Sequence, residues 1–230
     1  MVEKMKVAVL GTGMVGRAHA ARLSEIGVDV IMGTGDIDKT MASTKQDAMG
    51  NPPFNAWYKE HAQITVERFS NAARHGEVVI NALSGAAAVS VLRSIEGDLE
   101  DKILIDISVP LDFSFGFPPR LSVCNDNSLG EEIQKALPRV RVVKTLNTIT
   151  APLQVDAGAA GGGDHTNFVA GNDPAERARV AALLREWYGW SDSIDLGDIT
   201  NARGTEMYIA LWVRLLGPLK TPMFNVKIVK

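Results

Sequence analysis

Three glycines near the N-terminus are spaced as in a turn that binds phosphate. They stand in VAVLGTGMVG as Gly11, Gly13 and Gly16, the pattern G-x-G-x-x-G. The first glycine permits the tight turn, the second lets the backbone approach a diphosphate, and the third lets the next helix pack closely. Because the start of a helix attracts anions, this turn predicts a dinucleotide site rather than a turn without a ligand. The expected contacts are Gly11, Thr12, Gly13, Met14, Val15 and Gly16.

The stretch VIMGTGDIDKT, residues 30–40, is where such proteins select NAD or NADP. An NAD-selecting carboxylate usually ends the second strand, where it binds both hydroxyls of the adenosine ribose. Thr34 stands there instead, with a neutral hydroxyl that is compatible with a phosphate oxygen. Asp36 comes two residues later and is expected to cap a helix that begins near Lys39. We therefore predict NADP(H), bound by Thr34, Gly35 and Lys39, with NAD as the alternative because no arginine fork is present.

Strands alternate with helices along the first two thirds of the chain. Short apolar runs, typical of strands buried on both faces of a parallel sheet, occur at KVAVL (6–10), DVIMG (29–33), ITV (64–66), EVVINAL (77–83), KILIDIS (102–108) and RVRVVKTL (139–146). Residues 14–26 and 86–95 are expected to be helices, and residues 49–57 a loop rich in Gly, Pro and aromatics. This alternation predicts an α/β fold, a Rossmann-type doubly wound parallel sheet with helices on both faces.

The ends of three later strands should face the same crevice, because ligands of this fold bind beyond the carboxyl ends of the strands. ALSGAAA follows the fourth strand, DISVPLDF the fifth and KTLNTITAP the sixth. Contacts with the nicotinamide half are expected from Leu83, Ser84, Gly85, Ser108, Pro110, Asn147 and Ile149, beside Val109, Leu146 and Thr148. For Ser84 and Ser108 an ordinary role in a turn is an open alternative.

The chain changes character after the sixth strand. Asn172 or Asp173 can cap a helix that Gly189 ends. We therefore expect a dinucleotide-binding domain at residues 1–149 and a small C-terminal domain at residues 150–230, which completes the cleft. This small domain also contains a strongly apolar helix in TEMYIALWVRLLG, which packs into the core or against another subunit.

The overall composition excludes several classes of protein. The 230 residues carry a net charge of -3, which offers no footprint for nucleic acid or an anionic membrane. No apolar run approaches the roughly 20 residues that span a bilayer. A single cysteine, Cys124, permits no disulfide framework or thiolate metal cluster, and the four histidines lack metal-ligand spacing. His19 is expected to lie at the surface or in packing. We expect a soluble cytoplasmic protein without a metal, whose partner is a small-molecule hydride acceptor or donor.

Several of these blocks together resemble the family of NADP oxidoreductases that depend on coenzyme F-420. The likeness covers nearly the whole chain, from residues 7–36 through VVKTLNTI and GDHTNFVAGND to LGDITNARGTEMYIALWVRLLG. The resemblance implies hydride transfer between NADP(H) and the 5-deazaflavin coenzyme F-420, with the two rings stacked, in a homodimer. Two residues depart from the family pattern. Gly35 replaces an arginine that grips the 2′-phosphate, and Asn147 replaces a histidine of the archaeal members.

The mechanism that the resemblance implies asks little of side chains, so no catalytic residue is assigned. The protein would contribute proximity and exclusion of water. Two alternatives remain from the sequence: an NADPH-dependent reductase of another flat acceptor, such as a flavin or ferric complex, and a non-catalytic NADP(H)-binding sensor. Imine and β-hydroxyacid reductases normally have a larger helical second domain than residues 150–230 can form.

Overall fold

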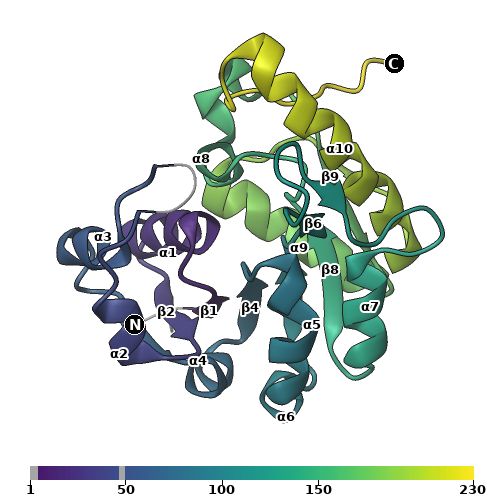
Figure 1. Cartoon of the computed structure of the whole chain (residues 1–230). Coiled ribbons are helices and arrows are strands. Elements are labelled where there is room, and N and C mark those ends of the chain that lie inside the picture. Colours follow the sequence, from purple (N-terminus) through teal and green to yellow (C-terminus); the bar gives the residue numbers. More distant parts are fainter. Residues whose placement is uncertain (1–4, 47–49) are drawn as a thin grey trace.

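The computed structural model describes residues 5–46 and 50–230, which form an eight-stranded sheet in the order β10-β9-β8-β5-β4-β1-β2-β3 (Figure 1). Six of these strands are parallel and match the six runs of the sequence: β1 (Lys6–Leu10), β2 (Asp29–Thr34), β3 (Thr65–Arg68), β4 (Val78–Asn81), β5 (Ile103–Asp106) and β8 (Arg141–Thr145). This is the strand order of the doubly wound fold. The predicted fold class is therefore confirmed.

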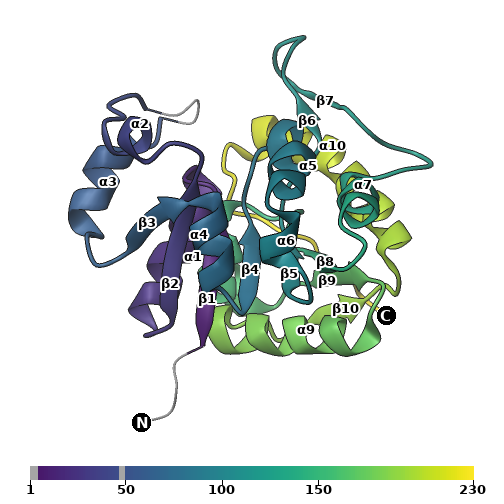
Figure 2. The same cartoon turned by 90° about the horizontal axis from the view of Figure 1, so that it is seen from below.

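Helices cover both faces of the sheet, because each central strand is apolar on both sides. Val7 and Val9 of β1 pack in one core with Leu23, while Ala8 and Leu10 pack in a second core on the other face. Such alternation follows from the two-residue period of a strand. The first core lies under α1 (Met14–Glu25) and α9 (Pro174–Tyr188), and the second under α4 (Phe69–His75), α5 (Gly85–Ser94), α6 (Glu96–Leu99) and α7 (Leu129–Ala136) (Figure 2).

The C-terminal part continues the same sheet. Strand β9 (Asn167–Gly171) pairs antiparallel with β8, and β10 (Ser193–Asp195) pairs parallel with β9. Helix α10 (Ala202–Leu219) then packs beside α7. The remaining elements are α2 (Ile37–Met41), α3 (Phe54–Glu60), α8 (Ala151–Gln154), the hairpin strands β6 (Leu111–Asp112) and β7 (Arg120–Leu121), and three 3-10 turns at Ala157–Ala159, Gly161–Gly163 and Ile199–Asn201. The domain boundary after residue 149 stays a prediction.

Local residue signals predicted the start of α2 and both ends of α9. Asp36 caps α2 by accepting a hydrogen bond from Lys39 N at 2.9 Å, and Asp173 caps α9. Gly189 ends α9 with a φ of 79°. The prediction of a loop over residues 49–57 is wrong from Phe54 onward, where α3 begins; residue 49 itself lies outside the described part. Phe54 is buried in the core, so its packing outweighs the local preference for a loop.

No helix within the described part of the chain is long and apolar enough to cross a membrane.

His19 is fully buried at the centre of α1, in agreement with a packing role. Its Nε2 lies 3.0 Å from Gln154 Oε1 and its Nδ1 lies 2.8 Å from the hydroxyl of Tyr188. Because Gln154 Oε1 can only accept, the neutral imidazole carries its proton on Nε2. The ring therefore ties α1 to α8 and α9.

Acid should loosen this contact. Burial lowers the pKa of His19 from 6.5 to about 4, although the hydrogen bond to Gln154 opposes the shift. The folded state favours neutral imidazole, so this contribution is fully present above about pH 6.5 and is lost as the pH falls toward about 4; it amounts to about 3 kcal/mol. Urea unfolding at a series of pH values should show a smaller loss of stability in acid for His19→Gln than for the native chain. Equal losses in the two proteins would contradict the assignment.

Candidate active site

The glycine turn between β1 and α1 leaves an open, uncapped helix N-terminus. Gly11 has a φ of 117°, and a Cβ there would lie 2.5 Å from the carbonyl oxygen of Ala82. A Cβ on Gly16 would lie 2.0 Å from the carbonyl oxygen of Gly11. Gly13 differs, because a Cβ on it would meet nothing within 4 Å. No described side chain caps α1 at Gly13, so the first N–H groups of the helix face this space, as a bound diphosphate requires.

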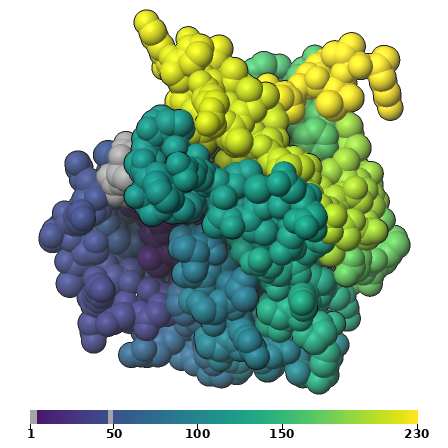
Figure 3. All heavy atoms as spheres, turned by 45° about the vertical axis from the view of Figure 1, so that its right-hand side comes forward, coloured from purple at the N-terminus to yellow at the C-terminus, as the bar shows by residue number. Residues whose placement is uncertain are grey.

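A cationic pocket of about 510 Å³ lies on one side of this turn. It brings together Thr12, Gly13, Thr34, Gly35 and Lys39, as the sequence predicted, with Asp36, Thr40 and the bases Arg17 and Lys45. The Oγ1 atoms of Thr34 and Thr40 are 2.8 Å apart. The described lining residues include three cations and one carboxylate, Asp36, whose Oδ1 accepts the capping hydrogen bond of α2. Figure 3 shows purple N-terminal residues at the bottom of a recess between blue and teal segments.

Sequence reasoning missed Arg17, which begins the second turn of α1. Its guanidinium is buried and Nη1 donates to the carbonyl oxygen of Pro52 at 2.6 Å. The sequence did contain a signal for it, because Arg17 is a basic residue that directly follows Gly16, the third glycine of the motif. A second arginine, Arg68 at the end of β3, donates from Nη1 to the carbonyl oxygen of Gly35 at 2.9 Å. A guanidinium thus lies beside Gly35, although residue 35 itself has no side chain.

A second, apolar cavity of about 160 Å³ lies on the other side of the glycine turn. Of the predicted residues it includes Met14, Val15, Val109, Asn147 and Ile149. Its remaining walls come from Ile107, Leu111, Thr150, Ala151, Gln154, Ile209, Trp212 and Val213. Hereafter it is called the ring cavity. None of its described lining residues carries an ionisable side chain.

Two buried N–H groups in the walls of the ring cavity have no protein partner. They are Nδ2 of Asn147, a residue that is 4% exposed, and Nε1 of Trp212. A buried donor without an acceptor costs about 1–3 kcal/mol, so a ligand oxygen would stabilise both. Trp212 was expected in the core or at an interface, and its role in the cavity becomes visible only because it shares the cavity wall with the segments that follow β5 and β8.

Nine predicted contact residues lie outside the walls of the two cavities: Gly11, Gly16, Leu83, Ser84, Gly85, Ser108, Pro110, Leu146 and Thr148. Leu83, Ser84 and Gly85 form the start of α5, and a Cβ on Gly85 would lie 2.1 Å from the carbonyl oxygen of Val109. Ser108 donates from Oγ to Asp106 Oδ1 at 2.6 Å, and the carbonyl oxygen of Pro110 accepts from Ser122 N at 2.8 Å. The structure therefore shows roles for Leu83, Ser84, Gly85, Ser108 and Pro110 in shaping the loops, and a role as ligand contacts stays a prediction for all of the residues outside the walls.

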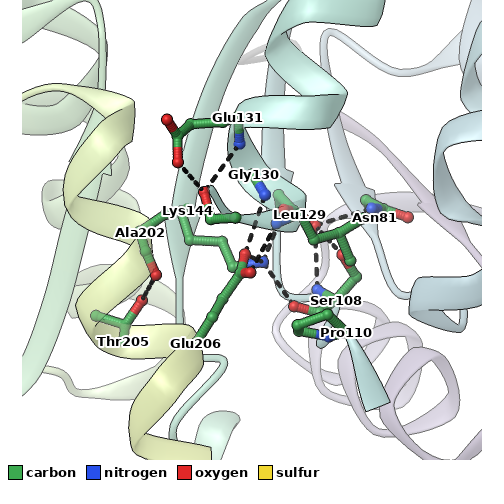
Figure 4. Close-up of polar contacts among 12 residues, drawn as sticks. Asn81, Ser108, Pro110, Leu129, Gly130, Glu131, Lys144, Ala202, Thr205 and Glu206 are labelled. Carbon is green, nitrogen blue, oxygen red and sulfur yellow. Dashed lines mark hydrogen bonds and ion pairs between the residues drawn. The ribbon is translucent and has the colours of Figure 1, made fainter. Parts of the chain in front are cut away.

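A fully buried ion cluster joins β5, β8 and α10 (Figure 4). Lys144 Nζ is 2.9 Å from Asp106 Oδ2 and 2.8 Å from Glu206 Oε1. Burial alone would lower the pKa of Lys144, but the charges and hydrogen bonds of the two carboxylates outweigh it and raise the pKa. The ammonium is therefore permanently charged. These three residues were not singled out from the sequence: Asp106 and Lys144 lie in segments that carried predicted contacts, and Glu206 lies in the apolar helix that was expected to pack in the core or against another subunit.

The comparisons with known proteins agree with this geometry. The sequence profile of the family described as "NADP oxidoreductase coenzyme F420-dependent" matches residues 6–110. A crystal structure from Arthrobacter sp. FB24, provisionally described as an F420-dependent NADP reductase, is 48% identical, covers 98% of this chain and 100% of its own, and has a TM-score of 0.92. The chain belongs to the coenzyme F-420-dependent NADP oxidoreductase family.

More distant relatives include members of this family and one protein with another acceptor. The F420-dependent NADP reductase of Methanothermobacter marburgensis is 28% identical over 92% of both chains. The metalloreductase STEAP3 of Rattus norvegicus is 27% identical over 96% of this chain, which corresponds to 39% of the rat protein. The chain is thus similar in sequence to part of a protein named as a metalloreductase.

Proposed function

We propose that this protein transfers a hydride between NADP(H) and coenzyme F-420. One observation carries the proposal: the uncapped N-terminus of α1 separates a cationic pocket from an apolar ring cavity. When bound, NADPH supplies a hydride from C4 of its nicotinamide and the deazaflavin accepts it at C5. The open space at Gly13 suits the diphosphate that joins the two halves of the dinucleotide. The anionic oxygens of the diphosphate can accept hydrogen bonds from the backbone N–H groups at the start of α1.

The cationic pocket would hold the adenosine half of the dinucleotide. Thr34 can offer its hydroxyl to a phosphate oxygen, and Lys39 with Lys45 can supply positive charge. Arg68 does not line the pocket, but its Nη1 donates to the carbonyl oxygen of Gly35, and we propose that it stands in for the family's missing arginine. Asp36 already caps α2 and does not serve as an NAD-selecting carboxylate. These contacts favour NADP(H) over NAD(H).

The ring cavity would hold the nicotinamide against the acceptor. Asn147 Nδ2 and Trp212 Nε1 are unpartnered donors that can bind carbonyl oxygens of either ring system. Apolar walls exclude water, which favours direct hydride transfer because no proton needs to be moved in that step. The absence of ionisable groups from the described lining residues fits the same scheme. Catalysis then depends on proximity and orientation rather than on acid–base chemistry.

An acceptor panel tests this proposal. The purified protein is given NADPH or NADH with coenzyme F-420, FMN or a ferric chelate, and nucleotide oxidation is followed. We expect NADPH with coenzyme F-420 to be the fastest pair. Faster turnover with FMN or the chelate would favour the alternative reductase, for which the likeness to the metalloreductase is the supporting observation. Tight NADPH binding without oxidation by any acceptor would favour a sensor.

Restoring the arginine at residue 35 should sharpen coenzyme selection. A Cβ on Gly35 meets only Phe69 Cε2 at 3.4 Å, an ordinary contact, so Gly35→Arg should fold normally. The new guanidinium can bind the 2′-phosphate, and we expect the ratio of kcat/KM for NADPH over NADH to rise about tenfold. Gly35→Ala is the matched control and should leave the ratio near its native value. A rise with alanine, or none with arginine, would contradict this reading of the pocket.

We also propose a homodimer, in which α10 forms part of the interface. Met207, Leu211 and Leu219 on this helix are 38%, 54% and 47% exposed, and burial of apolar side chains favours association. Sedimentation of the purified chain tests the oligomeric state, and a monomer at all concentrations would remove the proposal. Location in the cytoplasm stays a prediction from the sequence.

A further inference from the structure

The ammonium group of Lys144 joins three segments of the chain that are far apart in sequence. It donates to Asp106 Oδ2 at 2.9 Å and to the carbonyl oxygen of Ser108 at 2.6 Å, and it lies 2.8 Å from Glu206 Oε1. An ammonium has three protons, so these acceptors use all of them. Figure 4 shows Lys144 from β8 and Glu206 from α10 pointing toward each other.

The two carboxylates of this cluster are saturated as well. Glu206 accepts hydrogen bonds from the backbone N–H groups of Leu129 and Gly130, at 2.7 and 3.0 Å, and thereby caps α7. Asp106 Oδ1 accepts from Asn81 Nδ2 at 2.8 Å, besides the hydroxyl of Ser108. Charged groups in a protein interior stabilise a fold little better than apolar side chains of similar volume. A cluster of this completeness therefore suggests a requirement for one fixed geometry.

Each segment that the cluster joins also forms a wall of the ring cavity. Ser108 stands between Ile107 and Val109, whose side chains line the cavity. Glu206 lies on the same face of α10 as Ile209 and Val213, three and seven residues further along, and both line the cavity. The third wall is the loop that comes directly after β8, the strand of Lys144. This loop carries the cavity residues Asn147, Ile149 and Thr150.

We propose that Lys144 is a positioning residue for the nicotinamide ring, an inference that rests on the proposed function. Lys144 is not among the residues that line the cavity. It acts through the loop after β5 and through α10, and so sets the width of the space into which the ring enters. The adenosine pocket lies beyond β1 and β2 and shares no lining residue with the cluster. Loss of Lys144 should therefore affect the ring and spare the adenosine half.

Binding of two ligands to Lys144→Met separates these effects. The ligands are NADP⁺ and phosphoadenosine diphosphoribose, which is NADP⁺ without its nicotinamide. In the native protein NADP⁺ should bind more tightly, and in Lys144→Met this advantage should shrink about tenfold or more while the ring-less ligand binds as before. With coenzyme F-420, kcat should fall about 100-fold and KM for NADPH much less, because a ring misplaced by about 1 Å loses reactivity. Arg141→Met, which breaks the Arg141–Glu176 pair at the start of the same strand, is the control.

Several results would overturn the inference: equal weakening of both ligands in Lys144→Met, unchanged binding of both, or a native protein that binds both equally well. Should Lys144→Met fail to fold, Glu206→Gln is read in the same way, since it keeps the side-chain shape and removes one charge. The binding comparison needs no acceptor. Failure of the native protein to reduce coenzyme F-420 would therefore count against the proposed function alone, while the ligand pair still decides the role of Lys144.

Discussion

Replacing Gly13 with alanine should weaken NADPH binding about 100-fold while the protein stays folded. Gly13 has a φ of -73°, which alanine adopts readily, and a Cβ there meets no protein atom within 4 Å. The new methyl group would instead stand at the N-terminus of α1, where we place the diphosphate. If the displaced diphosphate loses even one charge-assisted hydrogen bond to the backbone, its binding free energy weakens by about 1.5–3 kcal/mol. A change of about 1.4 kcal/mol is a factor of ten in affinity.

Calorimetric titration with NADPH and a thermal melt measure the two sides of this prediction. Gly97→Ala is a matched control, since its Cβ also meets nothing within 4 Å and α6 lies at the other end of the sheet (Figure 1). It should bind NADPH normally. If Gly13→Ala bound NADPH as tightly as the native chain, the diphosphate would have to lie elsewhere.

Gly16→Ala should have the opposite profile, with its main effect on the fold. A Cβ on Gly16 would lie 2.0 Å from the carbonyl oxygen and 2.9 Å from the carbonyl carbon of Gly11. These are backbone atoms of the same turn, so α1 must move away from β1. Overpacking of this kind costs about 3 kcal/mol or more, which lowers Tm by about 6–12 °C in a chain of this size.

The same thermal melt tests Gly16→Ala, with Gly13→Ala now serving as the control for an added methyl group in the turn. We expect the two variants to separate the functions of the motif: one glycine is required for the ligand and the other for packing. A Tm for Gly16→Ala within about 1 °C of the native value would contradict this prediction. It would show that the turn can accommodate a methyl group despite the close approach of Gly11 and Gly16.

The sheet and the glycine turn could be predicted because their signals are local. A strand buried on both faces is a short apolar run, and a cap such as Asp36 or Asp173 acts within three residues of its own position. The right-handed connections between parallel strands then limit the possible strand orders to a few. For these features neighbouring residues suffice.

The features that the sequence did not predict depend on contacts between distant residues. Lys144 and Asp106 are 38 residues apart, and Glu206 lies on the last helix, so no local pattern joins them. Trp212 belongs to an apolar helix in which core, interface and cavity positions look alike.

Transfer of deuterium from NADPH to coenzyme F-420 tests the proposed function most directly. Two samples of NADPH, each carrying deuterium on one face of nicotinamide C4, are oxidised by the protein in ordinary water. Mass spectrometry then locates the label in the reduced deazaflavin. Direct transfer between stacked rings predicts deuterium at C5 from one of the two samples and none from the other. Hydrogen from water at C5 in both samples would contradict direct transfer.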